Sequence, residues 1–139
     1  MVVTDRAEDV IAFVKERVAH VQDFGPATAL GVVDDTGALA AGVVYNDYTG
    51  GNLEMSVAAA FPNWCRPHVL AALFHYPFIQ LGVRRVSTTA RSDAAAKHVR
   101  RFAQHLGFKY EGTRKEFFPD GVGSVHFGML KRDCRWLEA

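Results

Sequence analysis

The chain has 139 residues, of which 49% are hydrophobic and 22% are charged, and its formal net charge at pH 7 is +1. This length and composition are those of one folded domain and exclude a disordered chain. The nearly balanced charge excludes binding to nucleic acid through overall basicity, and no apolar run approaches the ~18 residues of a membrane span. With no apolar leader at its charged N-terminus, the sequence predicts a single cytoplasmic domain over residues 1–139 that makes no membrane contact.

The first predicted element is an amphipathic helix. Thr4 is its expected N-cap, and Asp5 and Glu8 would lie in the first turn, where the helix dipole favours acids. Apolar residues then recur at near-helical spacing from Val10 to Val21, which predicts one buried face.

Three strands are predicted next. The apolar runs Ala29–Val33 and Leu39–Tyr45 flank a turn at Asp34–Gly37, which is the pattern of a hairpin. After a glycine-containing loop over residues 46–52, apolar and polar residues alternate along Leu53–Ala58. A period of two indicates a strand whose two faces meet different surroundings.

Helices and strands alternate in the second half of the chain. A helical stripe is expected from Arg66 to Gly82, with Pro77 kinking or splitting it because proline removes a backbone donor. Further elements follow in order: a strand (Arg85–Ala90), a helix capped by Ser92 or Asp93 and ended by Gly107, and a hairpin (Phe108–Phe118 with Gly123–Leu130). This order predicts an α/β fold with a mixed, mostly antiparallel sheet and helices on both faces.

The two cysteines do not indicate a metal site, and the C-terminal residues indicate a packing contact. Cys65 and Cys134 are far apart and are interpreted as free thiols in a reducing compartment, so no metal site is expected. Trp136 and Leu137 give the tail apolar surface that should dock on the domain or on a second subunit of a homodimer.

Several segments carry a resemblance to a known family. They are Leu53–Val57, Phe74–Val86, Ser92–Phe108 and Tyr110–Arg114, with Gly128–Leu130 closing the last strand. Together they resemble the GNAT superfamily, the Gcn5-related N-acetyltransferases. The similarity is greatest to the branch that acetylates protein N-terminal amines and to its phage-encoded relatives.

The resemblance implies a V-shaped opening between the fourth and fifth strands that takes acetyl-CoA or another acyl-CoA. In such a fold the pantetheine arm would pair along the fourth strand, and the pyrophosphate would sit at the following loop and helix start, where free N–H groups favour anions. The implied cofactor-binding residues are Ser56, Val57, Ala58, Trp64, Arg66, Pro67, His68, Asp93 and Lys97.

The chain departs from the family pattern at two places. The stretch Phe61–Arg66 lacks the glycines of the family's pyrophosphate loop, and Arg66 would have to compensate by charge. The slot of the tyrosine that many members use to protonate the leaving thiolate aligns with Ala103.

Candidate catalytic and acceptor-binding residues lie on or near the predicted strands. Glu54 is the expected general base, because family members often carry a glutamate on that strand, and Tyr110 is a candidate acid. Tyr45, Asp47 and Tyr48 precede the strand and are the candidate acceptor-binding residues.

Two further features have open interpretations. His126 alternates with apolar neighbours on a late strand and would face the cleft if the register allows. Lys97, Arg100 and Arg101 form either a solvated helix face, a site for the 3′-phosphate of coenzyme A, or a contact with nucleic acid.

The function implied is N-acyl transfer from an acyl-CoA to a primary amine on a small molecule or a peptide, with a modified nucleobase as a further acceptor. Two alternatives stay open: a non-catalytic binding module with the same fold, and a phage-type GNAT-fold enzyme that modifies DNA bases. A positive surface leading into the cleft would favour the latter.

Overall fold

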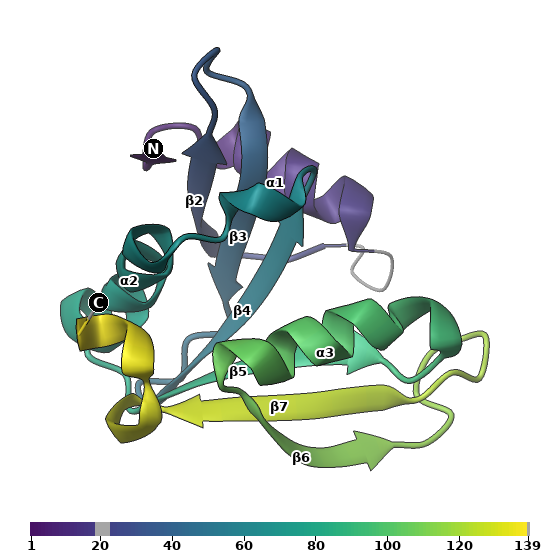
Figure 1. The fold of residues 1–139 in the computed structure, drawn as a ribbon. Coiled ribbons are helices and arrows are strands. Elements are labelled where there is room, and N and C mark those ends of the chain that lie inside the picture. Colours follow the sequence, from purple (N-terminus) through teal and green to yellow (C-terminus); the bar gives the residue numbers. More distant parts are fainter. Residues whose placement is uncertain (19–22, 139) are drawn as a thin grey trace.

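The computed structural model describes residues 1–18 and 23–138, and its seven strands form one sheet in the order β1-β2-β3-β4-β5-β7-β6 (Figure 1). The strands are β1 (Val2–Val3), β2 (Ala27–Val33), β3 (Leu39–Asn46), β4 (Asn52–Ala59), β5 (Arg85–Arg91), β6 (Lys109–Arg114) and β7 (Ser124–Leu130). The α-helices are α1 (Ala7–Arg17), α2 (Pro67–His75) and α3 (Lys97–Leu106). Shorter helical turns are η1 (Pro62–Trp64), η2 (Tyr76–Leu81), η3 (Ala94–Ala96), η4 (Lys131–Asp133) and η5 (Arg135–Glu138).

The sheet opens between its two central strands. β4 and β5 are its parallel pair, and their pairing ends at Glu54↔Ser87, although β4 continues to Ala59 and β5 to Arg91. Every other neighbouring pair is antiparallel. Figure 1 shows β4 turning away from β5 beyond this point, so among the residues described no strand pairs with that edge of the second half of β4.

Helices cover both faces of the sheet (Figure 1). α1 packs on β2, β3 and β4, and its Val10 and Val14 belong to a small buried cluster on that face. α2, η2 and α3 cover the opposite face and contribute to the larger core cluster, to which β4 adds Leu53 and Met55. Glu54 alternates with these two residues and therefore points to the α1 side of the sheet. The expected α/β fold, with a mostly antiparallel sheet and helices on both faces, is confirmed.

Proline and glycine shape the helix ends as expected. Pro77 interrupts the α-helical hydrogen-bonding pattern, so α2 passes into the wider π-type turn η2. Gly82 ends that turn with a φ of 78°, and Gly107 ends α3 with a φ of 110°. Both angles belong to the left-handed region, which glycine adopts without a steric penalty.

Two expected caps are wrong. α1 begins at Ala7 rather than after Thr4, because Val2 and Val3 form β1 and pair with β2. Neither Ser92 nor Asp93 caps a helix through its side chain, since η3 precedes α3 and no side-chain cap bond is made there. The end expected for the first helix, Val21, lies outside the described residues.

The C-terminal segment docks on the domain, which is one of the two outcomes expected for it. Trp136 Nε1 donates a hydrogen bond to the Leu106 carbonyl at 2.7 Å, and Leu137 packs against the main core. Among the residues described, no helix has the length and apolar character needed to cross a bilayer.

Candidate functional site

A cleft of about 730 Å³ lies on the α1 side of the sheet, where β4 and β5 separate. β4 contributes Glu54 and Ser56 to its lining, and residues from five other parts of the chain complete it. These are Asp23, Phe24, Asn46, Asp47, Thr89, Phe117, Phe118, Pro119, Ser124 and His126. The cleft thus joins the two halves of the sheet at their point of divergence.

Glu54 is the most strongly perturbed acid of the cleft. Burial and the nearby negative charge of Asp47 raise its pKa from 4.5 to about 7, and the positive charge of Arg85 partly opposes this rise. A carboxylate with a pKa near neutrality is suited to accept a proton at physiological pH.

The rim beside Glu54 is held by the end of β3. Asn46 pairs with Glu54 across the β3–β4 ladder, and its Nδ2 donates to the Phe24 carbonyl at 3.0 Å. The next residue, Asp47, has a φ of 52°, a left-handed conformation that ends the strand and begins the loop. The turn places the Asp47 carboxylate in the same cleft as Glu54.

His126 lines the opposite part of the cleft. It lies on β7 beside Thr89 of β5, and its Nε2 is 3.1 Å from Ser124 Oγ. Burial, with the positive charge of Arg114, lowers its pKa, and Glu111 partly opposes that effect. The ring is therefore held toward its neutral form, which can accept or relay a proton.

A polar network borders the cleft beside Glu54. The Arg85 guanidinium makes a bidentate ion pair with Glu111, donating from Nη1 to Oε2 at 2.9 Å and from Nη2 to Oε1. Its Nε also donates to Ser87 Oγ at 3.1 Å and to Asn52 Oδ1 at 3.2 Å. These acceptors come from β4, β5 and β6, so the network joins the two sides of the sheet.

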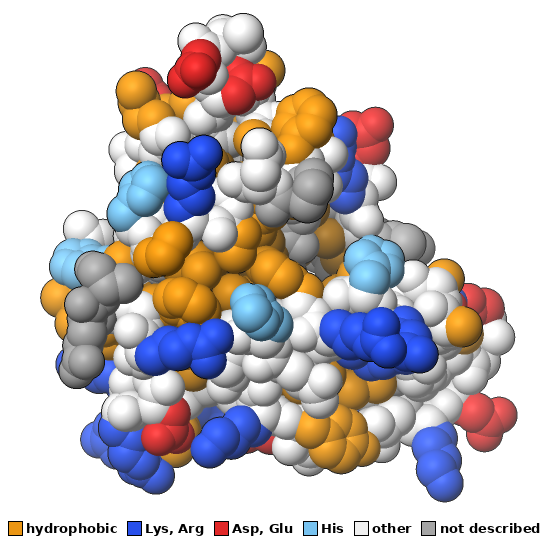
Figure 2. Space-filling view, in the orientation of Figure 1, with side chains coloured by type: hydrophobic (Ala, Val, Ile, Leu, Met, Phe, Trp, Pro, Cys, Tyr) orange, Lys and Arg blue, Asp and Glu red, His pale blue; other side chains and the backbone are white. Residues whose placement is uncertain are grey.

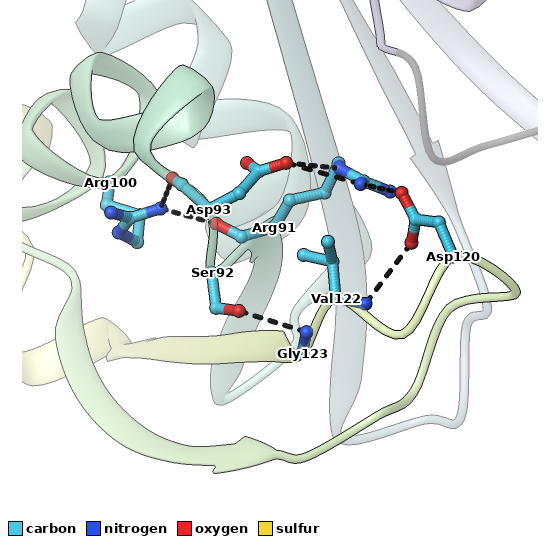
Figure 3. Close-up of polar contacts among 7 residues, drawn as sticks. All are labelled: Arg91, Ser92, Asp93, Arg100, Asp120, Val122 and Gly123. Carbon is cyan, nitrogen blue, oxygen red and sulfur yellow. Dashed lines mark hydrogen bonds and ion pairs between the residues drawn. The ribbon is translucent and has the colours of Figure 1, made fainter.

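A second network fixes the loop that carries Phe117, Phe118 and Pro119 (Figure 3). Arg91 at the end of β5 bonds to the carboxylates of Asp93 and Asp120, the latter lying between β6 and β7. Figure 3 also shows Arg100 of α3, whose Nη1 donates to the carbonyls of Arg91 at 2.6 Å and Asp93 at 2.7 Å. The network thereby ties α3 to the loop on the cleft rim.

The same loop is fastened to β5 through Ser92. Its backbone N–H donates to the Gly123 carbonyl at 2.9 Å, and its Oγ accepts from the Gly123 N–H at 2.9 Å. Val122 N donates to Asp120 Oδ1 at 3.2 Å, which completes the turn in Figure 3.

Three residues that the resemblance implies for coenzyme A, Arg66, Pro67 and His68, lie at the start of α2, the helix on the face opposite the cleft. Figure 2 shows hydrophobic side chains gathered between α2 and α3, with Lys, Arg and His side chains around them. At the start of α2 the amides of Arg66 and Val69 already donate to the Trp64 and Arg66 carbonyls, and Pro67 has none. A pyrophosphate would find few free amides there.

Charged side chains offset this shortage of amides. Arg66 is exposed and its side chain makes no ion pair or hydrogen bond with the residues described here, and His68 beside it is also exposed. A guanidinium is well suited to phosphate oxygens. The residues present therefore fit a pyrophosphate through side-chain charge rather than through a glycine loop.

The structure brings only some of the expected site residues together. Glu54, Ser56 and Asp47 share the cleft with His126. Arg66, Pro67 and His68 lie at the start of α2, and Lys97 is exposed at the start of α3.

Four expected cofactor-binding side chains are engaged in packing or ion pairing. Trp64 is 7% exposed and its ring packs on Phe102, so it belongs to the core. Ala58 is buried in the cluster under α1. Val57 packs against the main core, and the Asp93 carboxylate is bound by Arg91.

The tyrosines do not reach the cleft. Tyr45 is 1% exposed, and its hydroxyl donates to the Leu73 carbonyl at 2.6 Å. Tyr48 is exposed outside the cleft lining. Tyr110 lies on β6, the far edge of the sheet, and its ring packs on the core residue Phe127 on the opposite face from the cleft.

Sequence reasoning missed the polar face of β5 and its partner on β6. Arg85, Ser87 and Thr89 alternate with buried Val86, which is a period-two signal as clear as that of β4. Nothing in the sequence indicated that Glu111 would pair with Arg85.

Comparison with solved structures identifies the fold. A GCN5-related N-acetyltransferase from Brucella melitensis matches 77% of this chain over 52% of its own length, at 24% identity and a TM-score of 0.62. The chain thus spans about half of that protein. A spermidine N-acetyltransferase chimera from Vibrio cholerae and hSSAT matches 99% of this chain and 98% of its own, at 13% identity and a TM-score of 0.72.

A further structure, of mutant forms of the spermidine/spermine N-acetyltransferase from Vibrio cholerae, covers 94% of this chain and 79% of its own, at 17% identity and a TM-score of 0.63. No protein-family model matches the sequence, and no curated protein matches it either. The chain has the fold of the GNAT acetyltransferases.

Proposed function

We propose that the chain is an N-acyltransferase that moves an acetyl or related acyl group from coenzyme A to a primary amine, with Glu54 as the general base. The observation that carries this proposal is the coincidence of two features at one point. The β4–β5 pairing stops at Glu54, and the carboxylate of that residue has a pKa near neutrality. The fold it shares with known acetyltransferases supports the same conclusion.

Acyl-coenzyme A would supply the thioester whose carbonyl carbon the amine attacks, with the C–S bond breaking and the thiolate leaving to take a proton from solvent. The unpaired edge of β4 beyond Glu54 offers backbone donors and acceptors to an extended ligand. Arg66 and His68 would hold the phosphates at the start of α2, and Lys97 offers a further positive charge from α3.

The acceptor amine must lose a proton to become nucleophilic. Glu54 accepts that proton, because its raised pKa keeps the carboxylate a better base than an ordinary glutamate. His126 lines the same cleft with its pKa held low, and it can pass the proton on toward solvent.

The charge of the cleft favours an acceptor that is itself cationic. Asp23, Asp47 and Glu54 line it, and none of the described lining residues is lysine or arginine. Such a surface attracts ammonium groups and repels phosphates. It therefore supports a small-molecule or peptide amine and speaks against a nucleobase within a nucleic acid.

Two measurements test the proposal. Calorimetry with acetyl-coenzyme A should give a micromolar Kd, which corresponds to about 8 kcal/mol. A screen of primary amines should then show acetyl transfer that Glu54→Gln abolishes without weakening acetyl-coenzyme A binding. Absence of acetyl-coenzyme A binding by the wild type would overturn the proposal.

The glycine-free stretch before α2 gives a second candidate function. A GNAT-fold module that binds an amine in the cleft without transferring an acyl group would need no pyrophosphate site. In that case amines would bind to the wild type with no acetyl-coenzyme A binding, so the same calorimetry separates the two functions.

A further inference from the structure

The base candidate Glu54 has a positive neighbour that is unusually well held. Arg85 precedes by two residues the Ser87 that pairs with Glu54, so both side chains point to the cleft face of the sheet. The Arg85 guanidinium is held by Glu111, Ser87 and Asn52. A side chain tied at both its Nε and its terminal nitrogens has little freedom to swing toward or away from the carboxylate.

The backbone is shaped to let the pair form. Arg85 lies on β5 and Glu111 on β6, and β7 runs between those strands. The pair crosses β7 at Gly128, where a Cβ would collide with Arg85 Nη2 and with the Glu111 carboxylate. A side chain at that position would displace the ends of Arg85 and Glu111 from the arrangement seen here.

We propose that Arg85 is a positioning residue for Glu54, and that Glu111, by holding and partly neutralising the guanidinium, sets how much positive charge the Glu54 carboxylate experiences. Arg85 stabilises the ionised carboxylate by Coulombic attraction, while Glu111 limits that effect. The pair thus adjusts the protonation of the base without touching a substrate.

Other titratable groups lie in the same cleft as Glu54, and they define the background of the test. Asp47, from the loop after β3, raises its pKa together with burial. Asp23 and His126 line the same cleft. These groups stay unchanged in the variants below, so a difference between variants reports on the Arg85–Glu111 pair alone.

The proposal predicts that removing Arg85 and removing Glu111 shift the pKa of Glu54 in opposite directions. Removing the positive charge with Arg85→Met should raise the pKa of Glu54, by about 0.5 to 1 pH unit for one nearby charge partly screened by water. Removing the negative charge with Glu111→Gln should lower that pKa, because the guanidinium is then uncompensated. If the pair had a purely structural role, both variants would shift the pKa of Glu54 in the same direction, toward that of a more solvated carboxylate.

The test reads the Glu54 carboxyl directly. The full chain is labelled with ¹³C-glutamate and titrated by NMR, with the Glu54 signal assigned from Glu54→Gln. Arg101→Met, on the exposed surface of α3, serves as the matched control and should leave the titration unchanged. Arg85→Lys keeps the positive charge and should stay closer to the wild type than Arg85→Met does.

Shifts in opposite directions support the proposal. Shifts of the same sign, or no shift in Glu111→Gln, overturn it. Glu111→Gln decides the matter by itself if Arg85→Met does not fold. The catalytic meaning of the result rests on the proposed function, but the titration needs neither acyl donor nor acceptor. A failure of acyl transfer is therefore distinguishable from a failure of this inference.

Discussion

Gly128 lies beneath the guanidinium of Arg85, on the strand that separates Arg85 from its partner Glu111. The ion pair can lie flat across β7 because the residue under it has no side chain. Gly128 does not have a left-handed backbone conformation. Glycine is therefore favoured at this position by the space that Arg85 and Glu111 occupy, and not by its φ angle.

Gly128→Ala should therefore destabilise the protein. The added methyl group must displace the flexible, partly exposed ends of Arg85 and Glu111 and so weaken their ion pair, which should lower the free energy of unfolding by up to about 1 kcal/mol. Gly51→Ala is the matched control, because a Cβ there meets open space and no positive φ is required. Urea denaturation of both variants checks the difference, and equal midpoints would show that the pair adapts without strain.

Glu54→Gln should abolish most acyl transfer. Loss of a general base typically lowers the rate by about 10²–10⁴-fold. Acetyl-coenzyme A affinity should be unchanged, since Glu54 lies on the α1 side of the sheet. In the wild type kcat/KM should rise with pH through about 7, because only the ionised carboxylate accepts a proton. A flat profile between pH 6 and 8 would contradict this role.

The raised pKa of Glu54 should also appear in the stability of the protein. Below pH 4.5 the carboxyl is protonated in both states, and between 4.5 and about 7 only the folded state keeps the proton. The free energy of unfolding should thus fall as pH rises through this window, by an amount on the order of 3 kcal/mol.

Glu54→Gln removes this dependence and should be more stable than the wild type above pH 7. Denaturation at pH 5 and pH 8 measures this pH dependence of the free energy of unfolding, and Glu8→Gln on the exposed surface of α1 is the control. Identical pH dependence in the wild type and in Glu54→Gln would mean that the Glu54 carboxyl is not desolvated.

Arg66→Ala should weaken acetyl-coenzyme A binding. A hydrogen bond to a charged group contributes about 1.5–3 kcal/mol, which corresponds to a loss of affinity of roughly 10- to 100-fold. Arg132→Ala removes an exposed arginine of η4, which is not among the residues implied for coenzyme A, and should have little effect. Calorimetry measures the acetyl-coenzyme A affinity of both variants. Equal affinities would mean that the phosphates do not bind at Arg66.

Sequence periodicity predicted the main elements because each is a local property. The stripe ending at Gly82, the helix ending at Gly107 and the alternation of Leu53–Ala58 depend on neighbours along the chain, and all were confirmed. The two-residue strand β1 was missed because it exists only through pairing with β2.

The site was less predictable because it depends on strand order. β7 inserts between β5 and β6, which moves Tyr110 to the sheet edge and brings His126 into the cleft. Adjacent segments of sequence carry no sign of that insertion. Burial of Tyr45 and Trp64 likewise follows from how α2 and α3 cover the sheet, which alternation alone does not specify.

The docked C-terminal segment connects helices that cover different halves of the sheet. η5 packs against α2, which covers one half of the sheet, while Trp136 and Arg135 bond to the Leu106 and His105 carbonyls of α3, which covers the other half. The segment η5 therefore connects α2 on one half of the sheet to α3 on the other half. A chain cut before Arg135 would lose both of these connections with no change in any residue of the cleft.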